Sequence, residues 1–369
     1  MPDSTPTPGI ALALSGGGFR ATLFHLGSLW RLNEMGWLPK LKVITSVSGG
    51  SITAGYLGLR WKVLEFNGQG VAVNFEEAIV KPLRMFCQGT YDIWAGALGL
   101  LPGVGGGDVV AESYRGHLFG DATLQDMPDE AKAPRFILYA TSLQTGASVR
   151  FSKMFLRDYK VGRIDNPTVP LAKAVAASSA FPPVLSPVNV EVNPADWLRE
   201  DGNVHHDEPE LKERLVLTDG GVYDNLGLEA VFDRYETVLV SDAGAPFDLD
   251  RSPSGAWLSL TKRALLIASE QTRALRKRWL INEFKASVRK GTYWGIATHI
   301  DNYGLGDALA RDSERTAQLA RIRTRLNKFK DEEQERLINW GYALADAAIR
   351  RYVSPQTPRG AWLYPSQAL

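Results

Sequence analysis

The stretch from Val43 to Leu57 constrains the fold more than any other part of the sequence, because a β-branched run leads into a serine followed by glycines. Val43-Ile44-Thr45 is typical of a buried strand, and Gly49-Gly50 indicates a sharp turn before a helix. A strand, a tight turn and a helix in this order form the context of a nucleophile elbow. The free N–H groups at the start of the helix favour an oxyanion there. The sequence therefore predicts Ser48 as a nucleophile.

This elbow departs from the G-x-S-x-G pattern at its first position, where Ser46 stands in place of glycine. Taken alone, the stretch fits a serine-rich structural turn as well as it fits a catalytic elbow. The choice depends on whether the chain also supplies a base and hydrogen-bond donors for an oxyanion.

A second stretch has the same order of strand, glycine-rich turn and helix. The apolar run of residues 10–14 ends at Gly16-Gly17-Gly18, and a helical pattern follows. Consecutive N–H groups in such a loop bind anions. The loop lacks the Gly-Lys-Ser/Thr ending of a Walker loop and the G-x-G-x-x-G of a dinucleotide fold, which favours an oxyanion hole over a phosphate site. We expect Arg20 to hold the loop by hydrogen bonds.

A third stretch supplies a carboxylate. The strand pattern of residues 214–219 ends at Asp219, followed by Gly220-Gly221, and the carboxyl ends of strands are where α/β sheets gather their active sites. Asp242 ends a similar strand and is a rival base, although capping of the next turn is the more common role of such a residue. A triad requires a histidine, and His299 is the one that follows Asp219. An aspartate within hydrogen-bond reach of the serine is sufficient without it.

Composition limits the class of protein. With 369 residues, 44% of them hydrophobic, the chain forms one large α/β domain or two smaller ones. A net charge of +1 gives no sign of a nucleic-acid partner. The single Cys87 is expected to be a core thiol in a reducing compartment. His205 and His206 lack a third spaced ligand and are interpreted as solvated rather than metal-binding. Because no apolar run of ~20 residues is present, we expect a cytoplasmic protein with at most peripheral membrane contact.

Two other segments leave alternatives open. Residues 93–104 are apolar and glycine-rich, which fits a lid over an apolar pocket or a buried helix equally. Residues 262–290 carry nine basic side chains against two glutamates, with aromatic residues among them. This segment is either a helix that lies on an anionic membrane or the solvated face of a core helix. The basic residues are Lys262, Arg263, Arg273, Arg276, Lys277, Arg278, Lys285, Arg289 and Lys290.

Taken together, the three stretches resemble the patatin-like phospholipase family. Its glycine-rich oxyanion motif is matched by residues 16–20, its elbow by residues 46–50 and its Asp-Gly-Gly/Ala motif by residues 219–221. The stretch Ala177-Ser-Ser-Ala-Phe-Pro-Pro is similar to the segment that the family carries between nucleophile and base. The four motifs follow the family's order over residues 10 to 245.

The resemblance implies a three-layer α/β/α fold with a mostly parallel central sheet. It implies a lipid acyl hydrolase in which Asp219 takes the proton of Ser48, with Gly16, Gly17, Gly18 and Gly49 in the oxyanion hole. Arg20, Gly220 and Gly221 support this site, and no metal or other cofactor is required. The substrate is a phospholipid or another fatty-acyl ester.

Other functions use the same residues or the same fold. An acyltransferase or a thioesterase has the same site, and a non-hydrolytic lipid-binding scaffold keeps the fold. The family also includes effectors that wait for an oligomeric partner or a small-molecule activator. We expect residues 1–8 to be a disordered lead, residues 9–250 the catalytic core, and residues 251–369 a helical extension packed on that core.

Overall fold

A computed structural model describes residues 6–91 and 105–369 of the chain. The segment for which we predict a lid or a buried helix, residues 93–104, lies outside the described residues.

Five parallel strands form the centre of one sheet, in the order β11-β10-β1-β2-β3. Their side chains alternate between two hydrophobic cores, since Leu12 and Ile44 face one and Ala11 and Val43 face the other. Burial of both faces explains why these strands read as continuous apolar runs. The strands are β1 (Thr7–Leu14), β2 (Leu41–Val47), β3 (Arg135–Ser142), β10 (Tyr235–Asp242) and β11 (Lys290–Gly295).

Antiparallel strands extend this sheet beyond β3. On one edge of β3 the order continues through four strands, β4 (Ser148–Phe151), β5 (Phe155–Asp158), β6 (Gly162–Asp165) and β8 (Trp197–Leu198). On its other edge β3 pairs with β2 and then with β9 (Arg214–Asp219), which in turn pairs with β7 (Val188–Glu191).

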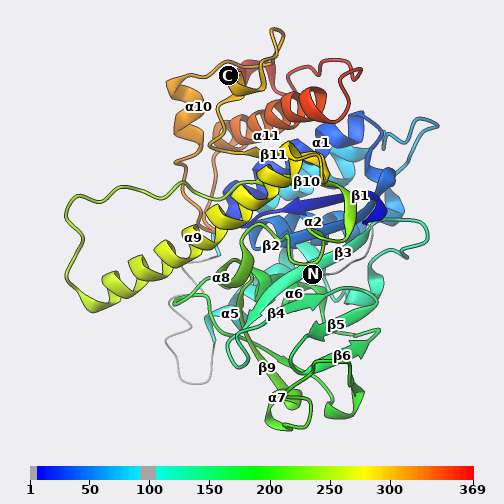
Figure 1. The fold of residues 1–369 in the computed structure, drawn as a ribbon, viewed down its shortest axis with the longest axis vertical. Helices are drawn as coiled ribbons and strands as arrows, with labels where there is room; N and C mark the ends of the chain where they lie inside the picture. The colour runs from blue at the N-terminus through cyan, green and yellow to red at the C-terminus, as the bar shows by residue number, and fades with distance from the viewer. Residues whose placement is uncertain (1–5, 92–104) are drawn as a thin grey trace.

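Helices cover both faces of the sheet, so the predicted three-layer α/β/α fold is confirmed (Figure 1). The first face carries α1 (Gly18–Glu34), α2 (Gly49–Arg60), α6 (Leu171–Ser179) and α11 (Asp331–Tyr352). The second face carries α8 (Gly221–Asp224) and α9 (Trp257–Lys285), whose first half extends away from the body of the molecule in Figure 1.

Short helices connect these elements. They are η1 (Leu38–Lys40), η2 (Trp61–Val63), η3 (Glu76–Val80), α3 (Lys81–Phe86), α5 (Gly106–Tyr114), η4 (Arg115–Phe119), η5 (Leu124–Asp126), η6 (Pro194–Asp196), α7 (Glu210–Glu213), η7 (Ile300–Tyr303), α10 (Glu314–Leu319) and η8 (Pro365–Gln367). Within the described ranges, no helix is both long enough and apolar enough to cross a bilayer.

Two boundaries differ from those expected from the sequence. β1 begins at Thr7, within the segment 1–8 for which we predict disorder, because its first residue already pairs with Tyr235. The C-terminal third is not only helical, since β11 lies within it and pairs in parallel with β10. Residues 251–369 therefore complete the sheet as well as pack on it.

The last long helix, α11, lies directly against α1. A Cβ on Gly27 of α1 would lie 1.9 Å from the Ile338 carbonyl oxygen, and a Cβ on Gly341 of α11 would lie 1.9 Å from that of Phe24. Only glycine permits two helix backbones to approach this closely. The C-terminal third thereby fixes the helix that begins at the glycine-rich loop.

Much of the basic charge of residues 262–290 forms ion pairs within the protein. Arg273 lies 2.9 Å from Asp242, and Arg276 lies 2.9 Å from Glu229. Arg289 is paired in the same way with a glutamate of its own segment. Arg273 and Arg276 therefore attach α9 to the second face of the sheet, and the charge run is weaker evidence for an anionic membrane than the sequence indicates.

Candidate active site

The edge of β3 brings the predicted nucleophile and base together. β2 runs parallel to β3 and ends with Val47 opposite Tyr139. β9 runs antiparallel along the same edge and ends with Asp219 opposite Ala140, the next residue of β3. The two strands thus meet end to end, and Ser48 follows directly after the end of β2. This register places two residues that are 171 positions apart in the sequence beside each other.

The backbone at Ser48 has the strained conformation of a nucleophile elbow. Its φ of 53° and ψ of −123° are uncommon for a residue other than glycine, and such strain gathers at active sites. The Ser48 N–H donates to Ser178 Oγ at 3.0 Å, and Ser178 Oγ donates in turn to Ser51 Oγ at 2.8 Å. The serine at the first elbow position, Ser46, lies 2.9 Å from Ser51 Oγ and joins this network. Replacement of the usual glycine is therefore compatible with the turn.

Asp219 is a buried carboxyl with a perturbed pKa. Its side chain is 2% exposed, and this burial raises its pKa from 3.8 to about 7. The Gly221 N–H, 2.7 Å from Oδ1, and the Ser48 side chain are its hydrogen-bonding neighbours and oppose that rise. A carboxylate that gains and loses a proton near neutral pH and contacts a serine hydroxyl has the properties of a general base.

The glycine-rich loop and the elbow lie against each other. A Cβ on Gly49 would lie 2.0 Å from the Gly18 carbonyl oxygen, and one on Gly18, where φ is +56°, would lie 1.7 Å from that of Thr324. Within the described residues, neither α1 nor α2 has a side-chain cap at its N-terminus. The N–H groups of Gly17, Gly18 and Gly49 therefore lie at two uncapped helix starts beside Ser48, where an oxyanion is favoured.

The N–H of Gly16, predicted as an oxyanion donor, is already used in a hydrogen bond within the protein. This N–H donates to the Asn225 carbonyl oxygen at 3.1 Å, so this hydrogen is not directed at a substrate. A Cβ at Gly16 would lie 3.1 Å from the Ser48 Cβ and 2.3 Å from Asn225 Oδ1. We assign Gly16 the role of a close contact that allows the loop to approach the nucleophile.

Arg20 is buried, as expected of a residue with a specific role, but its hydrogen bonds differ from the predicted ones. Its guanidinium donates to the Ala243 carbonyl oxygen at 2.6 Å rather than to the glycine loop. It also donates to the carbonyls of Ala320 and Ile322 at 3.0 and 2.8 Å. Arg20 thus ties the first turn of α1 to the end of β10 and to the segment after α10.

The rival acid and the histidines have other roles. Asp242 Oδ1 accepts from the Gly244 N–H at 2.8 Å, which is the turn-capping role given above as the alternative. Burial raises the pKa of Asp242, but the Arg273 guanidinium and further hydrogen bonds outweigh burial and lower it. His299 is exposed and lies 3.4 Å from Asp312. His205 lies 2.6 Å from Glu208.

No group of three His, Cys, Asp or Glu side chains is placed to hold a metal ion in the part of the chain that the structure describes. Cys87 is buried, as predicted, and burial raises the pKa of its thiol.

Sequence reasoning missed a buried polar network beneath the loop. His25 Nε2 lies 2.9 Å from the Ser15 carbonyl oxygen, and Nδ1 lies 2.8 Å from Ser241 Oγ. Burial lowers the pKa of His25 to about 4, so the ring is neutral at physiological pH. Its position among the apolar residues of α1 gave no sign of these partners. Ser178 carried a signal, because it belongs to the stretch 177–183 noted above.

Solved structures of a human protein share the fold of this chain. Human GIVD cytosolic phospholipase A2 matches with a TM-score of 0.52 at 12% identity, over 94% of this chain and 62% of that one. The same human protein in complex with methyl gamma-linolenyl fluorophosphonate matches with a TM-score of 0.52 at 15% identity, over 92% and 57%. The chain thus spans about three fifths of the human protein's length, and identity this low shows the shared fold alone.

A comparison with curated proteins found no match. The model of the patatin-like phospholipase family matches residues 12–232, a span that contains the glycine-rich loop, the elbow with Ser48, and Asp219. Since this span is more than half of the 369 residues, the chain belongs to the patatin-like phospholipase family of lipid hydrolases.

Proposed function

We propose that this protein is a lipid acyl hydrolase that cleaves fatty-acyl esters with a dyad of Ser48 and Asp219. The observation that carries the proposal is the meeting of the two residues at one edge of β3, with the serine in a strained elbow and the aspartate buried beside it. A serine becomes a nucleophile when an adjacent base accepts its proton.

In the first half of the reaction, Ser48 Oγ attacks the ester carbonyl while its proton passes to the Asp219 carboxylate. The negative charge that develops on the carbonyl oxygen is stabilised by the N–H groups of Gly17, Gly18 and Gly49. Asp219 then donates the proton to the leaving alcohol as the ester bond breaks. The fatty-acyl group remains on Ser48 as an acyl-enzyme.

In the second half, Asp219 accepts a proton from water, and the resulting hydroxide attacks the acyl-enzyme carbonyl. The same N–H groups stabilise the second tetrahedral oxyanion. Its collapse returns the proton to Ser48 and releases the fatty acid. A pKa near 7 suits both directions of transfer, because Asp219 acts once as a base and once as an acid in each half.

The test measures fatty-acid release from mixed phospholipid vesicles. We expect Ser48→Ala and Asp219→Asn to lower the rate by at least about 10³-fold, as substitutions of paired catalytic residues do. Ser366→Ala, at an exposed serine near the end of the chain, and Asp121→Asn, whose side chain is 89% exposed, are the matched controls and should retain activity. Full activity in Ser48→Ala would exclude the mechanism.

A second readout separates reactivity from turnover. An alkyl fluorophosphonate, the class of reagent named for the human relative, should add covalently to Ser48 with loss of fluoride. Mass spectrometry of the treated protein should locate the adduct on the peptide that carries Ser48, and Ser48→Ala should not react. An adduct on another serine would contradict the assignment of the nucleophile.

The first half of α9 is our candidate for peripheral contact with a lipid surface. Three of its apolar side chains, Trp257, Leu258 and Leu260, are 77%, 54% and 46% exposed. Exposed apolar groups on one projecting helix are typical of a surface that binds another apolar phase. Leu260→Ser should lower sedimentation with vesicles and leave hydrolysis of a short, water-soluble ester unchanged. Equal sedimentation with the wild type would rule out this contact.

A further inference from the structure

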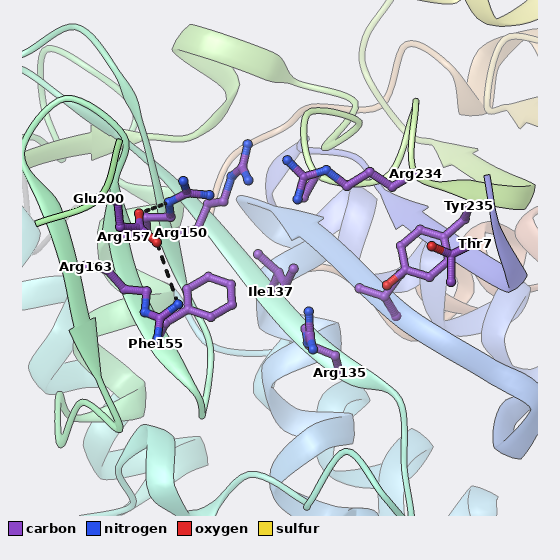
Figure 2. Close-up of a pocket in the computed structure, with 12 residues that line it drawn as sticks. Thr7, Arg135, Ile137, Arg150, Phe155, Arg157, Arg163, Glu200, Arg234 and Tyr235 are labelled. Atoms are coloured by element: carbon purple, nitrogen blue, oxygen red, sulfur yellow. Dashed lines mark hydrogen bonds and ion pairs between the residues drawn. The ribbon is translucent and has the colours of Figure 1, made fainter. Parts of the chain in front are cut away.

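A cationic pocket lies on the face of the sheet that carries α8 and α9. It has a volume of about 270 Å³, and its wall contains five arginines and one carboxylate. Figure 2 shows these side chains directed around one space, with Glu200 between two of the arginines. The five arginines are Arg135, Arg150, Arg157, Arg163 and Arg234.

This pocket is separate from the candidate active site. Thr7, Arg135 and Tyr235, all in its wall, are the first residues of β1, β3 and β10. The pocket therefore lies at the amino ends of the parallel strands, whereas the nucleophile lies at a carboxyl end. Val43 of the wall precedes Ser48 by five residues on β2, a separation of about 16 Å along an extended strand.

Three of the arginines form a row across adjacent strands. Arg150 of β4 is directly opposite Arg157 of β5, which is directly opposite Arg163 of β6. Residues opposite each other in an antiparallel pair share one face and have Cβ atoms about 5 Å apart. Like charges in such positions destabilise a sheet. The three arginines therefore repel one another unless negative charge lies between them.

Carboxylates neutralise only part of this charge. Glu200 lies 2.6 Å from Arg157 Nε and 3.6 Å from Arg163 Nη1. Arg163 also pairs with Asp165 at 2.6 Å, and Arg135 pairs with Glu130 at 2.6 Å. Arg150 forms no ion pair within the described part of the chain, and its Cζ lies 5.9 Å from the centre of the Tyr139 ring. Arg234 Nε lies 3.8 Å from Asp233 Oδ1, which is a weak pair. Four carboxylates thus face the five arginines, and the positive excess of the pocket lies at Arg150.

We propose that this pocket binds an anion that carries two or more phosphate groups. A guanidinium presents paired N–H donors that match the oxygens of a phosphate, and several guanidinium groups around one cavity suit a ligand with several such groups. The apolar side of the pocket, with Ile137 and Phe155, contacts the remainder of the ligand. A soluble polyphosphate compound and a phosphorylated lipid head group share this chemistry.

The first test uses inorganic tripolyphosphate and isothermal titration calorimetry with the full chain. We expect the wild type to bind tripolyphosphate and Arg150→Gln to bind it with an affinity lower by about tenfold or more. The reason is that hydrogen bonds to charged groups contribute about 1.5–3 kcal/mol. Among the described residues Arg150 has no ion pair to lose, so the variant should fold, and circular dichroism checks this. Arg359→Gln, an exposed arginine outside the pocket, is the matched control and should bind as the wild type does.

A second variant predicts a change of the opposite sign. Glu200→Gln removes the one carboxylate in the wall and should tighten tripolyphosphate binding roughly three- to tenfold. General loss of structure cannot produce tighter binding. Unchanged or weaker binding in a folded Glu200→Gln variant would overturn the proposal.

Two further arms distinguish the source of the ligand and separate this site from catalysis. Binding of free tripolyphosphate that depends on Arg150 supports a soluble ligand. Binding only to vesicles that contain a phosphorylated inositol lipid, with the same dependence, supports a head group. Ser48→Ala should bind either probe as tightly as the wild type, whatever becomes of the proposed hydrolysis. Absence of binding to both probes, or equal binding by Arg150→Gln, would refute the site.

Discussion

Asp219→Asn should make the protein more stable at neutral and alkaline pH while it abolishes the proposed chemistry. The wild-type carboxyl is buried, and its pKa is raised from 3.8 to about 7. Each pKa unit corresponds to about 1.4 kcal/mol, so ionisation of Asp219 in the folded protein costs about 4 kcal/mol relative to the unfolded chain. An asparagine has no charge to bury, and its side-chain oxygen still accepts a hydrogen bond from Gly221.

The direction of the pH dependence follows from which state holds the proton. Below pH 3.8 the carboxyl is protonated in both the folded and the unfolded protein, and the cost is absent. Between 3.8 and about 7 the unfolded chain releases this proton while the folded protein retains it, so rising pH favours unfolding. Above about 7 the cost is constant. The group therefore contributes stability that is fully present at low pH and is lost as pH rises.

The assay is urea unfolding of wild type and Asp219→Asn, followed by circular dichroism across this range. We expect the stability advantage of the variant to grow by about 3 kcal/mol between about pH 5 and pH 8. Other titrating groups are common to both proteins and cancel in the difference. A difference in unfolding free energy that does not change with pH would refute the raised pKa of Asp219.

The hydrolytic activity of the wild type should rise with pH over the same interval in which the stability contributed by Asp219 falls. The dyad requires the Asp219 carboxylate as the base, so kcat/KM for an ester should rise with pH and reach a plateau above an apparent pKa of about 7. A rate already at its plateau near pH 5 would show that the base is a group with an ordinary carboxyl pKa.

Three further substitutions test the surroundings of the dyad. Gly49→Ala places a Cβ 2.0 Å from the Gly18 carbonyl oxygen and should lower the hydrolysis rate by about 10²-fold or more, measured as fatty-acid release. Arg20→Gln removes a buried guanidinium with three carbonyl partners and should lower the free energy of unfolding in urea by about 2–4 kcal/mol. Ser178→Ala removes the acceptor of the Ser48 N–H and should cost about 1 kcal/mol of stability, with a moderate loss of kcat.

The three motifs were predictable because each is a local pattern. A strand followed by a glycine-rich turn and a helix can be recognised within about ten consecutive residues. The strand that ends at Asp219 and the strand that ends before Ser48 are both present as predicted. The meeting of Ser48 and Asp219 was expected from chemistry, whereas the register that produces it is a property of β3. Neither motif contains a pattern that predicts the pairing of β2 and β9 with the same edge of β3.

Interactions between distant segments are where the sequence prediction failed. Arg20 was expected to bind its own loop, but its carbonyl partners at Ala243, Ala320 and Ile322 are more than 200 residues away. The basic residues of the 262–290 segment were visible as a charge run, but Asp242 and Glu229, which pair with Arg273 and Arg276, come from other elements. A charge run alone cannot distinguish a buried ion pair from a free cation.

The same long-range contacts show that the site depends on residues beyond the span matched by the family model, which ends at 232. The loop donor Gly18 lies against the Thr324 carbonyl, and the next residue, Phe19, donates its N–H to the Arg325 carbonyl oxygen at 3.4 Å. α11 packs along α1, the helix whose first turn carries these residues. An oxyanion hole stabilises a transition state only when its donors are held in place before the reaction. We therefore propose that the C-terminal third belongs to the catalytic unit, because without it the start of α1 beside Ser48 would lose its support.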